Sequence, residues 1–276
     1  MNRIELNTTR LIDLPVDISR GSSTGDDKVF ILRKSEDKYV NGYDETIEIE
    51  DEFLITPIFA TDYTRYRFKE NENNFLIFPY NYTDDTFVLL DESYIKDKSP
   101  KLYQYLYSNI SRLKQRKQFS KWYGYSAARN LKIHGSSDIM IPLLADKGLF
   151  TITPKNKNYT LMAGGGFSIS IRNETINKHY LLALLNSKLL FFLLARESNK
   201  FRGGYITCTK QYVENLPIKI ISELDQQSFV VLVQQILSAK QHETKKDTSH
   251  LESEIDQLVY KLYEINDNEI KIIEAN

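Results

Sequence analysis

The feature that most restricts the fold of this sequence is an apolar stretch from Tyr180 to Ala195, interrupted by Asn186-Ser187-Lys188. Leucine and phenylalanine recur at helical spacing on both sides of the interruption, which predicts a helix from Asn177 to about Ser198, broken at Asn186-Ser187. The stretch is too short to cross a bilayer. It therefore predicts a buried helical core, with these candidate core residues: Leu181, Leu184, Leu185, Leu189, Phe192 and Leu193.

A chain of 276 residues with 41% hydrophobic and 26% charged residues can bury one core, or one core and a small helical appendage. The single cysteine, Cys208, excludes an internal disulfide and a zinc site made of several cysteines, and it fits a reducing compartment. The first residues lack the apolar core of a signal peptide. We therefore expect a cytoplasmic protein with no membrane partner.

Charge is unevenly distributed along the chain. No Asp or Glu occurs between Lys98 and Ser137, whereas residues 36–52 hold eight acids and the segment from Ser222 onward holds eleven acids against five bases. Such segregation can create a phosphate-binding face on a chain whose formal net charge is only −1. Aromatic residues among the bases favour a DNA-facing surface over a merely solvated helix face. The predicted contacts to the DNA backbone are Arg112, Lys114, Arg116, Lys117, Lys121, Arg129 and Lys132, with Lys200 and Arg202 further along the chain.

The N-terminal third predicts short strands and turns. A polar loop bracketed by glycines, Arg20–Asp27, precedes a strand-like segment, Lys28–Leu32, and two more strand-bounded segments follow at Leu54–Tyr66 and Phe75–Tyr80. A phosphate-cradling loop would need a following helix and usually a lysine, so we do not assign one to Arg20–Asp27.

The middle of the chain predicts one long helix and more strands. Ser99-Pro100 is a typical helix start, and leucines at helical spacing extend that helix to about Gln118, with Arg112, Arg116 and Lys117 on its outer face. Residues 138–144 predict a buried strand. Residues 157–171 predict a strand hairpin around Gly164-Gly165-Gly166, which we interpret as a bulge or a close backbone crossing.

The C-terminal part predicts two amphipathic helices, at residues 225–241 and 249–263, and a final short helix after Asn266. Such a hairpin is expected to pack on its own domain. The predicted fold class is α+β, with mixed short-strand sheets and packed helices over residues 1–221 and a C-terminal helical hairpin in an extension over residues 222–276.

Several segments together resemble a known family. Arg202-Gly203-Gly204-Tyr205 follows the broken helix, and Asn215-Leu216-Pro217-Ile218 begins eleven residues after Gly204. With the Arg20–Gly25 loop, Leu54–Tyr66 and the apolar run ending in Pro79-Tyr80, this succession resembles the TaqI-like C-terminal specificity domain. That family is the DNA target-recognition part of adenine-N6 methyltransferases and of fused type IIG restriction–modification enzymes, and the helical ending is similar to the tail of type IIG enzymes.

The resemblance implies a chain that reads double-stranded DNA and does no chemistry itself. The partner it implies is a catalytic methyltransferase domain in the same parent polypeptide. The cofactors would belong to that parent: S-adenosylmethionine, and magnesium where a nuclease is fused. No cofactor is expected in this chain.

Missing motifs support a reader without chemistry. The chain has no Pro-Pro pair, which adenine-N6 methyltransferases need to hold the flipped base, and its one glycine cluster lacks the context of a cofactor loop. Three alternatives stay open. They are a type I specificity subunit, a small metal-dependent nuclease using Asp26 or Glu36, and a protein-interaction module working through the acidic helical tail.

Base recognition is assigned to two places. The polar loop contributes Arg20, Ser22, Ser23, Thr24 and Asp26. Arg65 and Arg67 would share one face if their segment is extended, and either could bind guanine through two hydrogen bonds.

Overall fold

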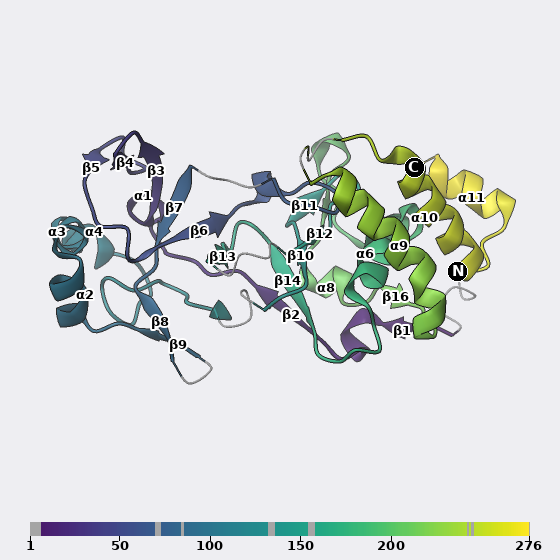
Figure 1. Ribbon diagram of the computed structural model, residues 1–276, viewed down its shortest axis with the longest axis horizontal. Helices are drawn as coiled ribbons and strands as arrows, with labels where there is room; N and C mark the ends of the chain where they lie inside the picture. Colours follow the sequence, from purple (N-terminus) through teal and green to yellow (C-terminus); the bar gives the residue numbers. More distant parts are fainter. Residues whose placement is uncertain are drawn as a thin grey trace.

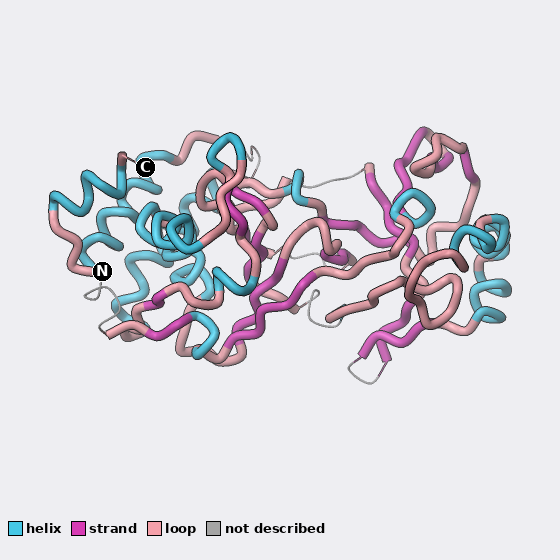
Figure 2. Tube along the Cα trace, turned by 180° about the vertical axis from the view of Figure 1, so that it is seen from behind, coloured by secondary structure: helices cyan, strands magenta, loops and turns pink. Residues whose placement is uncertain are grey.

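The computed structural model describes residues 7–69, 73–83, 86–131, 136–153, 158–241, 243 and 246–275. Over these residues the molecule is elongated, with a mainly helical end and an end that combines short strands and helices (Figures 1 and 2). The observed fold class is α+β, as predicted.

Two large hydrophobic cores underlie the two ends. One core gathers buried side chains mainly from the chain before Arg20 and after residue 136, among them Leu11, Ile141 and Leu184, and it also includes Tyr66. The other is built from residues 29–131, such as Phe30 and Leu102, joined by Met162. The chain therefore leaves the first core after the second strand, builds the other end, and returns to the first core.

The mixed end contains a six-stranded sheet in the order β13-β6-β7-β3-β4-β5, in which only the β13–β6 pair is parallel. A two-stranded hairpin, β8–β9, lies beside it (Figure 1). The elements of this end are α1 (Asp27–Phe30), β3 (Ile31–Ser35), β4 (Lys38–Val40), β5 (Thr46–Ile47), β6 (Leu54–Ile58), β7 (Asn74–Ile77), β8 (Tyr80–Thr83), β9 (Thr86–Leu89), α2 (Glu92–Lys98), α3 (Pro100–Ser108), α4 (Ile110–Leu113) and β13 (Tyr159–Leu161).

The helical end packs its helices on an antiparallel sheet of order β12-β10-β14-β2. The strands of this end are β1 (Thr9–Arg10), β2 (Val16–Arg20), β10 (Ile139–Ile141), β11 (Leu144–Ala145), β12 (Thr151–Ile152), β14 (Phe167–Ile171), β15 (Ile206–Thr207) and β16 (Pro217–Ile218). Its helices are α6 (Lys178–Asn186), α7 (Lys188–Glu197), α8 (Lys210–Val213), α9 (Glu223–Ala239), α10 (Ser249–Leu262) and α11 (Asp267–Glu274). Short 3-10 turns lie at Leu11–Asp13, Ala60–Asp62 and Arg202–Gly204.

The broken apolar helix forms as predicted. α6 and α7 meet at an angle of 63°, and Ser187 begins the second helix by accepting a hydrogen bond from the Leu190 amide. The Asp256 carboxylate accepts another from the Lys188 amide at 2.8 Å. Among the described residues no single helix is long and apolar enough to cross a membrane. The α6–α7 pair is long and apolar enough only when its two helices are taken together, and its buried leucines belong to the core.

The C-terminal helices pack on their own domain, as predicted. Phe229 and Val233 of α9 and Ile255 of α10 belong to the same core as α6 and β10. The predicted boundary at residue 221 stays a prediction, but no separate core lies beyond it within the described part of the chain.

Three local predictions are wrong. Lys28–Leu32 is not all strand, because the Val29 and Phe30 amides both donate to the Asp26 carbonyl and form α1. The helix that starts at Pro100 ends at Ser108, where the Ser108 hydroxyl and the Asn109 side-chain amide both donate to the Tyr105 carbonyl. A further turn, α4, ends at Leu113. Side-chain donors that compete for helix carbonyls in this way weaken the helix.

The expected hairpin over residues 157–171 does not form either. β13 pairs with β6 and β14 pairs with β2 and β10, so the two strands belong to different sheets. The glycine triplet lies where the chain passes from one sheet to the other. A Cβ on Gly165 would lie 2.5 Å from the Ile58 carbonyl oxygen of β6, and a Cβ on Gly166 would lie 1.9 Å from the Ile141 carbonyl oxygen of β10.

Candidate nucleic-acid interface

The Arg20–Asp27 loop is fastened on both sides by backbone hydrogen bonds. On one side the Ser22 amide donates to the Leu161 carbonyl at 2.8 Å. On the other, Ser23 and Ala127 exchange two hydrogen bonds of 3.0 Å. The loop therefore has a defined shape and lies between the β13 segment and residues 126–130.

Within this loop only part of the predicted recognition set faces solvent. Ser22 and Thr24 are fully buried, and their hydroxyls bond the Arg129 carbonyl and the Asp27 carboxylate. These two side chains support the loop from inside, so the expectation that they face a DNA groove is wrong. Arg20 is exposed and Ser23 and Asp26 are half-buried, and their roles stay predictions.

Arg116 is the centre of the packing under the loop. Its guanidinium donates to the carbonyls of Thr24 at 2.6 Å, Gly124 at 2.8 Å and Trp122 at 2.5 Å. Its Nε atom donates to a fourth carbonyl, that of Leu113, at 2.8 Å. Burial lowers the pKa of this guanidinium below its usual value. The predicted outer-face position of Arg116 is therefore wrong, because its donors point into the protein.

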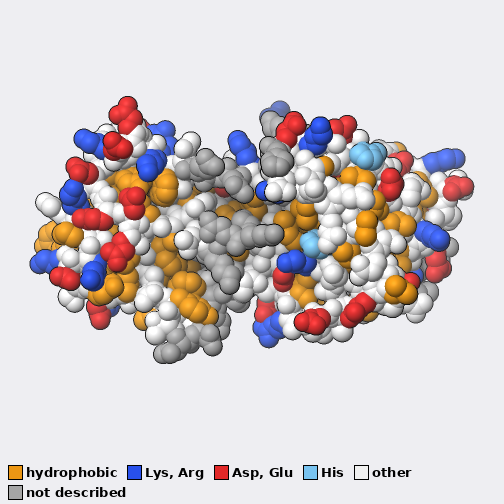
Figure 3. Space-filling model, viewed as in Figure 1, with side chains coloured by type: hydrophobic (Ala, Val, Ile, Leu, Met, Phe, Trp, Pro, Cys, Tyr) orange, Lys and Arg blue, Asp and Glu red, His pale blue; other side chains and the backbone are white. Residues whose placement is uncertain are grey.

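The acid-free stretch acquires acidic neighbours from other parts of the chain. Lys101 Nζ lies 2.6 Å from Glu48 Oε1, and this contact lowers the pKa of the Glu48 carboxyl. The Glu50 carboxylate accepts from the Lys101 and Leu102 amides and so caps the start of α3. Lys121 lies 3.3 Å from Asp91. On the face shown in Figure 3, blue and red side chains are accordingly mixed at the end that contains α2 and α3.

Four further cations of that stretch are exposed. They are Arg112, Lys114, Lys117 and Arg129. Arg112 stacks on Tyr43, with Cζ 3.8 Å from the ring centroid, and Lys28 Nζ lies 5.0 Å from the same centroid. Tyr43 and Lys28 were not predicted as site residues, because only the tertiary fold brings Arg112 near the acidic segment. Lys132 lies outside the described residues.

The Arg65–Arg67 segment is not extended, since Tyr66 has a φ of 73°. Arg65 turns toward the C-terminal helices, where its Nη1 atom lies 2.6 Å from Glu252 Oε2 and its Nη2 atom donates to the Asn186 carbonyl. The prediction that Arg65 and Arg67 share one face is therefore wrong. Arg65 instead links the segment that follows β6 to α10. Arg67 is half-buried.

Lys200 and Arg202 lie on an exposed loop after α7. The loop closes through a hydrogen bond of 2.7 Å from the Phe201 amide to the Tyr205 carbonyl, and both aromatic side chains point away from the core, with 53% and 42% exposure.

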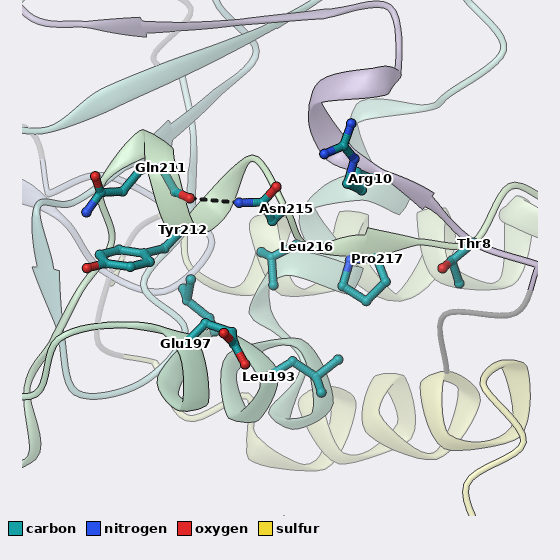
Figure 4. Close-up of a pocket in the computed structure, with 10 residues that line it drawn as sticks. Thr8, Arg10, Leu193, Glu197, Gln211, Tyr212, Asn215, Leu216 and Pro217 are labelled. Carbon is teal, nitrogen blue, oxygen red and sulfur yellow. Dashed lines mark hydrogen bonds between the residues drawn. The ribbon is translucent and has the colours of Figure 1, made fainter. Parts of the chain in front are cut away.

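A cavity of about 690 Å³ lies elsewhere, between α7, α8 and the β1–β16 pair (Figure 4). Its lining combines Leu193 and Tyr212 with polar groups, and Asn215 is held by a 2.8 Å hydrogen bond to the Gln211 carbonyl. Arg10 at its edge pairs with Asp13 at 2.7 Å. No nucleophile and general base face each other among these lining residues.

Metal chemistry has no assembled ligand set in the described part of the chain, where no group of three or more His, Cys, Asp or Glu side chains converges. Asp27 bonds Thr24 within its own loop, and Asp26 lies 3.5 Å from the Tyr43 hydroxyl. Glu36 lies at the turn between β3 and β4.

Comparison with known proteins places these features in a family. The TaqI-like C-terminal specificity domain matches residues 34–218. The chain belongs to this family. It is also 24% identical over 225 residues to the type II restriction enzyme and methyltransferase RM.Eco57I of Escherichia coli, a match that covers 74% of this chain and 22% of that protein. The specificity domain described here thus spans about a fifth of that relative.

The matched range contains the broken helix, the Arg202–Tyr205 loop and the segment ending at Ile218. The Arg20–Gly25 loop lies before the match, yet it pairs with residues inside it, among them Leu161 and Ala127. The structural unit therefore extends beyond the matched range on the N-terminal side.

Proposed function

We propose that this chain is the DNA target-recognition part of a restriction–modification protein, specifically of a site-specific adenine-N6 DNA methyltransferase or a fused type IIG enzyme. The observation that carries the proposal is membership in the TaqI-like specificity family over residues 34–218. The E. coli relative, named as both restriction enzyme and methyltransferase, supports the same assignment.

In this proposal the chain grips duplex DNA while a catalytic domain of the parent protein flips and methylates an adenine. S-adenosylmethionine, and magnesium for a fused nuclease, would be bound by that parent, and the protein would act in the cytoplasm. The exposed cations Arg112, Lys114, Lys117 and Arg129 would position the DNA backbone. The Arg20–Asp27 loop has a defined shape, and its exposed Arg20 is the strongest candidate for reaching a base edge.

The direct test is binding of the purified chain to a fluorescent duplex at several salt concentrations. If these four cations together with Lys200 and Arg202 each neutralise one phosphate, log K should fall against log salt with a slope of about −5. Absence of binding at low salt, or binding that does not respond to salt, would contradict the proposal. Cleavage of the duplex in magnesium would instead support the nuclease alternative.

The individual contacts are tested by Arg112→Ala and Lys117→Ala. Each should weaken binding to all sequences about equally and reduce the salt slope by about one unit. Arg33→Ala is the matched control, because Arg33 is exposed but pairs with Asp44 at 3.3 Å. An unchanged slope in the double variant would show that neither side chain neutralises a phosphate.

A further inference from the structure

The Lys200–Tyr205 loop combines features that packing inside the protein does not explain. All six residues are exposed, including the large side chains of Phe201 and Tyr205. Among the described residues neither the Lys200 nor the Arg202 side chain forms an ion pair with an acidic residue. Exposed apolar and cationic side chains side by side are typical of a binding surface.

The base of this loop is rigid. Lys200 and Ile206 form a β-bridge, and the Thr207 amide donates to the Asn199 carbonyl at 3.0 Å. β15 then pairs with β11, and Ile206 and Cys208 are buried in the large core. An exposed loop whose base is held by hydrogen bonds in this way loses little conformational entropy when it binds a partner.

The two glycines at the tip also face outward. Gly203 and Gly204 both have a φ of 82°, which favours glycine, and a Cβ on Gly204 would meet no atom within 4 Å. Internal crowding therefore does not require glycine at position 204. The turn leaves bare backbone at the surface, where another molecule can approach closely.

Charge distinguishes between the two classes of partner that aromatic loops bind. The segment from Ser198 to Val213 contains no Asp or Glu, but it contains three cationic residues, Lys200, Arg202 and Lys210. Aromatic residues and arginine occur often in protein–protein interfaces too, so they do not discriminate, whereas lysine is depleted there and is a common contact to phosphates. An exposed apolar side chain between such cations matches the wedges that minor-groove proteins insert at a base step. The loop thus fits DNA better than a protein surface.

We propose that this loop is a separate DNA contact, in which Phe201 enters a base step and Lys200 and Arg202 hold the flanking phosphates. The inference rests on the proposed function and adds to it an aromatic contact to the bases. Phe201 is the wedge because it is the more exposed of the two aromatic side chains, at 53% against 42% for Tyr205.

The first experiment compares the affinities of Phe201→Ala and Arg202→Ala for duplex DNA. Loss of base stacking should weaken binding by about 5- to 100-fold in Phe201→Ala and leave the salt slope unchanged. Arg202→Ala should reduce the slope by about one unit. Leu224→Ala is the control, since Leu224 is 81% exposed on α9 and lies far along the chain from the loop.

The second experiment uses Phe201→Trp as a fluorescent reporter. Stacking on bases should quench its emission when duplex is added, whereas heparin, a polyanion without bases, should not. The wild-type protein provides the baseline, because its one tryptophan, Trp122, is only 9% exposed.

The outcomes separate this inference from the proposed function. If the wild-type chain does not bind duplex at all, the proposed function fails. If it binds with the expected salt dependence but Phe201→Ala binds equally well, only the loop inference is overturned, and a protein partner becomes its better explanation. Equal weakening of duplex and heparin binding in Phe201→Ala, or equal quenching by both polyanions, would also overturn the wedge.

Discussion

At the residue scale, burial separates cations that hold the fold together from cations that can meet DNA. Arg116 and Lys117 are neighbours in the sequence, yet Arg116 donates to four backbone carbonyls while Lys117 is exposed. A buried carbonyl that loses its donor keeps the cost of its desolvation. The two positions therefore make opposite predictions for stability and for DNA binding.

Arg116→Ala should lower the free energy of unfolding by about 2–4 kcal/mol, because several carbonyls lose their donor at once. Lys117→Ala should change it by less than about 0.5 kcal/mol, as is usual for an exposed side chain. Urea unfolding followed by circular dichroism measures both. Equal stability of the two variants would contradict a structural role for Arg116.

Arg65→Ala tests whether this arginine is part of the fold or a free recognition residue. Its contact with Glu252 is mostly shielded, with the two side chains 20% and 14% exposed. Removing one partner of such a pair should cost about 3 kcal/mol of unfolding free energy. Arg33→Ala, which removes an exposed pair, should cost less than about 1 kcal/mol. Arg65 would be free to read DNA if its replacement left stability unchanged.

Asp256 gives a prediction for the pH dependence of stability. Burial raises the pKa of its carboxyl above the usual 3.8, although the Lys188 amide and Arg65 act in the opposite direction. The folded state then binds this proton more tightly than the unfolded chain does. The contribution of this group to the free energy of unfolding therefore falls as the pH rises from about 3.8 through the folded pKa.

Asp256→Asn keeps an acceptor for the Lys188 amide and removes this titration. Its stability relative to the wild type should therefore increase as the pH is raised from about 4 to about 7. Urea unfolding of both proteins across that range measures the difference. A difference that is constant, or that falls with rising pH, would show that the carboxyl is not held above its usual pKa.

At the scale of elements, the glycine triplet after β13 lets two sheets cross. Gly166 has a φ of 129° and lies against the Ile141 carbonyl, whereas a Cβ on Gly164 would meet nothing within 4 Å. Of these two positions in the triplet, only position 166 therefore needs glycine. The difference separates a structural crossing from a flexible glycine loop.

Gly166→Ala should destabilise the protein by about 2–5 kcal/mol, since it combines backbone strain with a steric clash. Gly164→Ala should leave stability within about 1 kcal/mol of the wild type. Thermal unfolding of the two variants side by side is the measurement. Similar melting temperatures for both would exclude a tight crossing at Gly166.

At the scale of the whole molecule, the C-terminal helices complete a core that begins at the N-terminus. Leu11 and Ile218 share it with Phe229, Val233 and Ile255. Removing the C-terminal helices would expose to water the core side chains of α6 and of the strands that Phe229, Val233 and Ile255 cover. A helical extension that shares a core in this way is not an independent unit.

A chain truncated after residue 221 should therefore lose cooperative unfolding and bind a hydrophobic dye, because its core stays open to water. Truncation after Ile265 should preserve the fold, since it removes only α11, whose one fully packed side chain is Ile273. Denaturant unfolding and dye fluorescence compare the two. A well-folded 1–221 fragment would support the boundary predicted from the sequence.

Local patterns in the sequence were sufficient for the elements whose stability comes from neighbours in the chain. The break at Asn186-Ser187, the helix start at Pro100 and the C-terminal amphipathic helices follow from apolar spacing and capping residues, and the structure confirms them. The family resemblance was likewise carried by short motifs and is confirmed over residues 34–218. These features need no knowledge of distant contacts.

Strand partners and the roles of charged side chains depended on contacts between distant residues. β13 pairs with β6 and not with its neighbour β14, and Arg65 meets Glu252 nearly two hundred residues away. The acid-free stretch gains Glu48 and Asp91 as partners in the same way. Charge and hydrogen-bonding capacity are properties of a residue, and the sequence by itself determined them. Only the tertiary structure decided whether those groups face water or the protein interior, because burial depends on which distant segments pack around them.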